Sequence, residues 1–162
     1  METFLFPAIL RFGMKTDLVV GGCLVHDNKV LLIHHKKLNK WLPVGGHIDK
    51  DEIPDDAIRR EFKEEVNLSI DLVDDMPEIA GKVKQLKKPI FVNLHNVGDH
   101  DHCCFYYLCT TGNLSELKIN EDELLGFRWL SRQELEDLNV LENVPLDVRS
   151  IALLALDMQE KR

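Results

Sequence analysis

The chain has 162 residues, 44% of them hydrophobic and 30% charged, which is the size and composition of one globular domain that can bury a core without disulfides or a structural metal. Its 20 basic and 28 acidic residues give a net charge of −8, which argues against a long nucleic acid as partner, because a phosphate backbone requires a basic face. The apolar stretches are all shorter than the roughly 18 residues of a membrane span, so we expect a cytoplasmic protein that does not partner a membrane.

The first predicted elements are two runs of β-branched and apolar residues, at 17–26 and 29–35. The pair Asp27-Asn28 between them is typical of a tight turn, so the two runs predict a β-hairpin. Pro43 and the Gly-Gly pair that follows it interrupt the strand pattern before the next element.

A helix is predicted over residues 54–66, because Pro54 suits the first helical turn and Asn67 can take the left-handed conformation that ends a helix. Four further strands are predicted near 69–73, 90–97, 103–110 and 126–130. Two more helices are predicted over 133–138, behind a capping box of Ser131 and Glu134, and over 146–158. Strands outnumber helices, which favours an α+β or mixed α/β fold with a mixed sheet and helices on its faces.

The helix over 54–66 carries its charge in an unusual place. Its apolar stripe is formed by Ile58, Phe62 and Val66. At 100° per residue, Glu61, Glu64 and Glu65 then lie beside this buried stripe rather than opposite it, and the small Ala57 leaves a hollow in front of them. An ordinary solvated acidic face would lie on the other side of the helix.

The three glutamates need a positive partner. Glu61 and Glu65 are a like-charge pair four residues apart, which is unfavourable, and more so if the sheet desolvates them. Arg60 can reach Glu64 or Glu52, but one guanidinium cannot neutralise three carboxylates and also satisfy Glu52. A divalent cation is the simplest remaining partner, and all-oxygen ligands favour Mg²⁺ or Mn²⁺ over zinc.

These residues carry a resemblance to a known family. Gly46, five residues, Glu52, seven residues and then the run REFKEEVNL (60–68) resemble the Nudix box of Nudix hydrolases. The one departure is Asn67, which stands where the family has Gly, and Asn is the best substitute for Gly at a positive-φ helix end.

The resemblance implies a single Nudix-type domain over residues 1–162, with 1–16 as an N-terminal extension, folded as a Nudix-like α/β/α sandwich around a mixed central sheet. It also implies hydrolysis of a diphosphate linkage in a small nucleoside diphosphate derivative, by attack of water on phosphorus with Mg²⁺ or Mn²⁺ as cofactor. Dimers are frequent in proteins of this kind, so a homodimer is a partner to consider.

By similarity, Glu61, Glu64 and Glu65 are metal ligands, and the carbonyl of Gly45 is a further candidate. Glu61 or Glu64 can instead be the general base. Arg60 and Glu52 are expected to hold the carboxylates in place. In some family members the base comes from a later loop, where Glu121 and Glu123 are the local candidates, although we favour a solvated acidic loop as the explanation of these two residues.

Substrate contacts are sought near the box. Lys36 and Lys37 leave the second strand on the substrate side in similar folds, so they are candidates for phosphate contacts. His47, beside the glycine pair, is a further candidate for substrate binding. A solvated turn explains the lysines equally well. Trp41 could stack on a base, although an aromatic residue here more often packs against the sheet.

The segment HNVGDHDH (95–102) is also unusual, because His100 and His102 have the spacing of two ligands on one strand face. A polar hairpin turn explains its composition without a metal, and we favour the turn. The alternative function for the whole chain is a regulatory module that binds a nucleotide on the same fold without cleaving it. The substrates left open are ADP-ribose, a nucleoside triphosphate, a dinucleoside polyphosphate, an RNA 5′ end and a sugar nucleotide.

Overall fold

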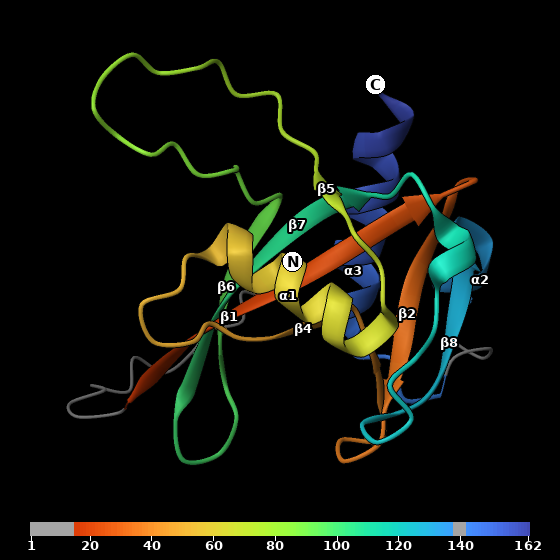
Figure 1. The fold of residues 1–162 in the computed structure, drawn as a ribbon. Helices are drawn as coiled ribbons and strands as arrows, with labels where there is room; N and C mark the ends of the chain where they lie inside the picture. The colour runs from red at the N-terminus through yellow and green to blue at the C-terminus, as the bar shows by residue number, and fades with distance from the viewer. Residues whose placement is uncertain (1–14, 138–141) are drawn as a thin grey trace, which may run out of the picture.

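The computed structural model describes residues 15–137 and 142–162 and has a mixed α+β architecture (Figure 1). The strands are β1 (Thr16–His26), β2 (Lys29–His35), β3 (Lys40–Leu42), β4 (Val44–His47), β5 (Asp71–Leu72), β6 (Phe91–Asn96), β7 (Asp101–Thr110) and β8 (Leu124–Ser131). The helices are α1 (Pro54–Val66), α2 (Arg132–Glu136) and α3 (Leu146–Glu160), with a 3₁₀ turn at Leu114–Glu116. None of the helices described is long and apolar enough to cross a membrane.

Strand β1 organises the sheet. It pairs in parallel with β7 over most of its length, and antiparallel with β4 along its middle and with β2 at its end. The sheet continues from β2 to β3 and β8, and from β7 to β5 and β6. One strand therefore joins the two halves of a mixed eight-stranded sheet.

Two hydrophobic cores lie on opposite faces of this sheet. On one face α1 packs Ile58 and Phe62 against Val20 and Leu24 of β1. On the other face α3 packs a second core that includes Cys23. Figure 1 shows α1 in front of the sheet and α3 behind it, which gives the α/β/α sandwich expected from the sequence.

Most predicted elements are confirmed within a residue or two. The hairpin turn has Asp27 at φ 46° and Asn28 at φ 55°, as a tight turn between antiparallel strands requires. The capping box of Ser131 and Glu134 is present at the start of α2. The predicted end of that helix at Leu138 lies outside the described residues.

The break predicted at Pro43 is present, because β3 ends before Pro43 and β4 begins after it. The break predicted at the glycine pair was wrong, because β4 contains both glycines. Their backbone is extended and pairs with β1. A Cβ on Gly45 would lie 2.1 Å from the carbonyl oxygen of Val20, so glycine is needed for this close approach of the two strands. Because the two central residues of this four-residue strand are glycines, the sequence shows no alternation of apolar and polar side chains there.

Asn67 provides a test of the helix end. It is in the left-handed region (φ 56°, ψ 28°), and its Nδ2 donates to the Glu116 carbonyl at 3.0 Å. We expect Asn67→Ala to lower the free energy of unfolding by about 1–2 kcal/mol. The backbone is strained at this φ in any residue with a Cβ, and alanine, unlike asparagine, has no polar side-chain atoms that could form a local hydrogen bond to offset the strain. The control Asn67→Gly should cost less, since it relieves the backbone while losing the same hydrogen bond. Urea unfolding measures both, and an alanine variant as stable as the glycine variant would contradict the explanation.

Candidate functional site

Burial of α1 against the sheet carries its glutamates to the edge of β4. Glu65 is only 3% exposed, and its Oε2 accepts the backbone N–H of Gly45 at 3.1 Å. The sequence placed Glu65 at the border of the apolar stripe, and the structure shows it deeper, inside the contact between α1 and β4. The helix and the glycine strand together therefore enclose a carboxylate.

Glu61 lies next to this position and depends on the second glycine. A Cβ on Gly46 would lie 2.4 Å from Glu61 Oε1, inside the space that the carboxylate occupies. The Glu61 side chain is 12% exposed, whereas that of Glu64 is 57% exposed. The three carboxylates thus run from a buried position to an open one.

Arg60 links the carboxylates of this region. Its Nε and Nη2 each donate to Glu52 at 2.9 Å, in a bidentate pair. Its Nη1 donates to Glu61 at 2.7 Å and to Glu64 at 3.1 Å, and Nη2 also donates to the His47 carbonyl at 2.9 Å. The hydrogen bond from Arg60 is the largest cause that lowers the pKa of Glu52. Among the described contacts of this guanidinium, none is with Glu65.

Burial makes ionisation of Glu65 and Glu61 unfavourable. Desolvation by burial, aided by the charges of Glu61, Glu123 and Glu64, raises the pKa of Glu65 to about 8, against the lowering effect of the Gly45 N–H. Desolvation also raises the pKa of Glu61, although Arg60 opposes it. A carboxylate that has left water without a matching cation is disfavoured, so this site favours any added positive charge.

The later acidic loop lies beside the C-terminal end of α1. Asn120 donates its backbone N–H to the Glu65 carbonyl at 2.8 Å. Glu123, in the same loop, is close enough for its charge to raise the pKa of both Glu61 and Glu65. Lys36 reaches this loop as well, because its Nζ donates to the Glu121 carbonyl. Lys36, one of the residues predicted to contact a phosphate, therefore lies at the rim of the acidic site.

The other predicted substrate residues lie elsewhere. Lys37 is exposed in the turn after β2. Trp41 stacks on His34 with ring centroids 4.6 Å apart and packs against the core on the α3 side of the sheet. His47 contributes its carbonyl to Arg60, but its ring lies 4.9 Å from that of His102.

A second polar cluster lies at the start of β1. The side chains of Asp17, His47, His100 and His102 bring one ligand atom each to within 4.8 Å of one another. Desolvation and the neighbouring imidazoles lower the pKa of His102. The predicted hairpin turn is present at residues 97–100, between β6 and β7, with Val97 N–H donating to the His100 carbonyl at 3.0 Å. The spacing of His100 and His102 was visible in the sequence, whereas their proximity to Asp17 and His47 depends on strand pairing.

Comparison with known proteins assigns most of the chain to a family. The family model of the NUDIX domain matches residues 15–153. A solved hydrolase of the NUDIX family from Clostridium perfringens is 30% identical, with a TM-score of 0.76, over 90% of this chain and 99% of that chain. No curated protein matches the sequence.

Two more distant structures share the fold. An ADP-ribose pyrophosphatase from Streptococcus suis is 18% identical, with a TM-score of 0.63, over 90% of this chain and 92% of that chain. An Ap4A hydrolase from C. elegans is 16% identical, also with a TM-score of 0.63, over 90% of this chain and 96% of that chain. At these identities the likeness shows the fold alone.

Proposed function

The chain belongs to the NUDIX family and is a Nudix hydrolase, and on that premise we propose that it hydrolyses a diphosphate linkage in a nucleoside diphosphate derivative, with Mg²⁺ or Mn²⁺ held by Glu61, Glu64 and Glu65. The substrate is a small molecule, as the names of an ADP-ribose pyrophosphatase and an Ap4A hydrolase among the structural neighbours suggest. We also propose that residues 1–162 act as one domain in the cytoplasm.

One observation carries the proposal. Glu65 is buried beside Glu61, and the sole arginine in contact with the cluster is engaged with Glu52, Glu61 and Glu64 in the part of the chain described. Among the described residues one arginine is shared by several carboxylates, and the oxygen donors are those that hard divalent cations prefer. The residues present therefore fit such a cation, and the Gly45 carbonyl is a further donor.

The protein groups have separable tasks in this proposal. A bound divalent cation would screen the repulsion between the carboxylates and the diphosphate, lower the pKa of a water and offset charge on the leaving phosphate. Glu61 or Glu64 accepts the proton of the attacking water, with Glu123 as the candidate from the later loop. Arg60 and Glu52 position Glu61 and Glu64 through the bidentate pair that anchors the guanidinium.

The substrate side is proposed at the rim formed by β2 and the acidic loop. Lys36 is the phosphate contact with the most support, because its side chain already lies against residue 121 near the glutamates. Lys37 is a second candidate in the same exposed turn. A role in substrate binding for Trp41 and His47 stays a prediction.

The test is a substrate panel with the whole chain. ADP-ribose, nucleoside triphosphates, a dinucleoside polyphosphate and a sugar nucleotide are incubated with and without Mg²⁺, and phosphate or nucleoside monophosphate release is measured. Release from at least one of them that requires the cation is the expected result. Tight nucleotide binding by a folded chain that hydrolyses none of them would support the regulatory module instead.

Gly46 provides a sharper test of the site. Gly46→Ala would place a Cβ 2.4 Å from Glu61 Oε1, at the flexible end of that side chain. We expect the carboxylate to move aside at little cost in melting temperature, while turnover falls by about 10²-fold because a ligand is displaced.

The matched control is Gly126→Ala in β8, where an added Cβ meets no heavy atom within 4 Å. Steady-state kinetics and a thermal melt of both variants compare the two effects. If Gly46→Ala kept its turnover, Glu61 would not belong to the reacting site.

A further inference from the structure

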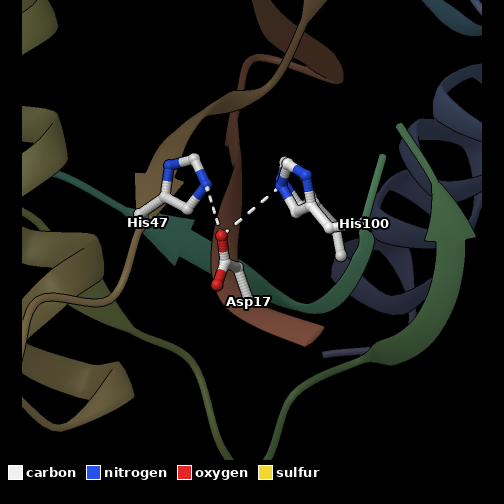
Figure 2. A group of neighbouring side chains, drawn as sticks. Asp17, His47 and His100 are labelled. Carbon is white, nitrogen blue, oxygen red and sulfur yellow. Dashed lines mark hydrogen bonds and ion pairs between the residues drawn. The ribbon is translucent and has the colours of Figure 1, made fainter. Parts of the chain in front are cut away.

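The cluster at the start of β1 gathers side chains from four segments. Asp17 comes from β1, His47 from β4, His100 from the β6–β7 turn and His102 from β7. Strand pairing brings them together, because Asp17 is in register with His102 and the residue two positions on, Val19, is in register with His47. Figure 2 shows the Asp17 carboxylate between the imidazole rings of His47 and His100.

The separations within the cluster are close to those between the ligands of one metal ion. His100 Nε2 lies 3.1 Å from His102 Nε2 and 3.4 Å from Asp17 Oδ2, and His47 Nε2 lies 3.9 Å from the same oxygen. Ligands bound tetrahedrally at zinc-to-nitrogen distances of about 2.0–2.1 Å are about 3.4 Å from each other. We propose that Asp17, His47, His100 and His102 form a zinc site that is separate from the glutamate site.

The two sites lie on opposite faces of the sheet. Side chains alternate between the faces along a strand. Gly46 faces Glu61 of α1, so its neighbour His47 points to the other face. Asp17 shares that face, because it is two residues from Val19, which packs against the core under α3. An ion bound here is thus separated from the glutamates by the sheet itself.

The surroundings of His100 resemble the outer partners of a metal ligand. Its Nδ1 lies 2.7 Å from Asp99 Oδ1, and a carboxylate oxygen can only accept, so Nδ1 carries the proton. In the neutral ring the lone pair is then on Nε2, which is the atom that faces the cluster. A carboxylate behind a ligating histidine fixes the tautomer and the ring orientation in known metal sites.

The ligand atoms of this cluster favour zinc over Mg²⁺ or Mn²⁺. Three imidazole nitrogens and one carboxylate suit zinc, whereas the oxygen-rich glutamate site suits Mg²⁺ or Mn²⁺. Lys15 also contacts Asp17, with Nζ 2.8 Å from Oδ1, but its side chain is 76% exposed and can turn to solvent when an ion binds. His47 is half exposed, which leaves a path for the ion.

A zinc ion in this position would tie three strands and a turn together. The ligands connect the beginnings of β1 and β7 to the end of β4, and so to the strand that carries Gly45 and Gly46. Because the ion binds only when these strands are assembled, it would stabilise the folded state. The site is accordingly structural, and it takes no part in the hydrolysis proposed above.

The test measures zinc binding rather than turnover. The whole chain is stripped with a chelator, dialysed, supplied with millimolar Mg²⁺ to fill the glutamate site, and titrated with Zn²⁺ by calorimetry. One zinc per chain and a higher melting temperature are expected. His47→Ala, which removes a half-exposed side chain, should weaken binding by about 10²-fold or more, and Asp99→Asn by about tenfold.

Two controls locate the ion. His26→Ala removes an exposed histidine at the far end of β1 and should leave the affinity unchanged. Glu65→Gln should retain the zinc, and cobalt substituted for zinc should show the intense visible absorption of a tetrahedral site. The proposal is overturned if the folded chain binds no zinc, if His47→Ala and His102→Ala bind it as tightly as the parent, or if Glu65→Gln abolishes binding. The cluster would then be a set of hydrogen-bonded side chains.

Discussion

Glu65→Gln is expected to lower Mg²⁺-dependent turnover by about 10³-fold, which is the rate equivalent of the several kcal/mol that metal ligation supplies to a transition state. The amide has the shape of the carboxylate, and its oxygen can still accept the Gly45 N–H, so the contact between α1 and β4 is retained. The substitution removes the charge that would hold the cation. Steady-state kinetics across a range of Mg²⁺ concentrations measure the effect.

The matched control is Glu136→Gln, which makes the same chemical change at an exposed position on α2 and should leave turnover unchanged. A thermal melt of both variants separates loss of the site from loss of the fold. Turnover in Glu65→Gln that equalled the parent's at every Mg²⁺ concentration would remove Glu65 from the ligand set.

Local patterns in the sequence predicted the elements that build the acidic site. The 3.6-residue stripe of α1 set the rotation of the helix and so placed Glu61 and Glu65 beside the core. Asn67 ended the helix as expected, in the left-handed conformation. These features depend on residues within a few positions of one another, which is why a single sequence is enough to find them.

The features that were missed depend on contacts between distant segments. Strand β4 has two glycines, and its reason for being a strand is the close approach to Val20 of β1 rather than any alternation of its own. The burial of Glu65 likewise depends on its contact with β4, where it accepts the backbone N–H of Gly45. The histidine cluster requires the parallel pairing of β1 with β7, which places Asp17 opposite His102 across more than half of the chain.

The metal-free protein is expected to lose stability as the pH rises from about 5 to 8. Burial raises the pKa of Glu65 in the folded state to about 8, from an ordinary value of 4.5 in the unfolded chain. The folded state therefore binds this proton more tightly, so the stabilisation is complete below pH 4.5 and is lost as the pH rises through 8. A shift of this size corresponds to a loss on the order of 4 kcal/mol, and the raised pKa of Glu61 acts in the same direction.

A comparison of parent and Glu65→Gln isolates this effect, because other groups titrate in both proteins. His102, whose pKa is lowered in the folded state, acts in the opposite direction near pH 6, but its contribution cancels in the difference between the two proteins.

With a chelator present, urea unfolding should give the two proteins similar stability at pH 5 and a more stable glutamine variant at pH 8. Saturating Mg²⁺ should stabilise the parent at pH 8 far more than the variant, since the cation replaces the proton. A stability difference that was the same at both pH values would mean that Glu65 is ionised in the folded protein at pH 5 as well as at pH 8. Burial would then not raise the pKa of Glu65.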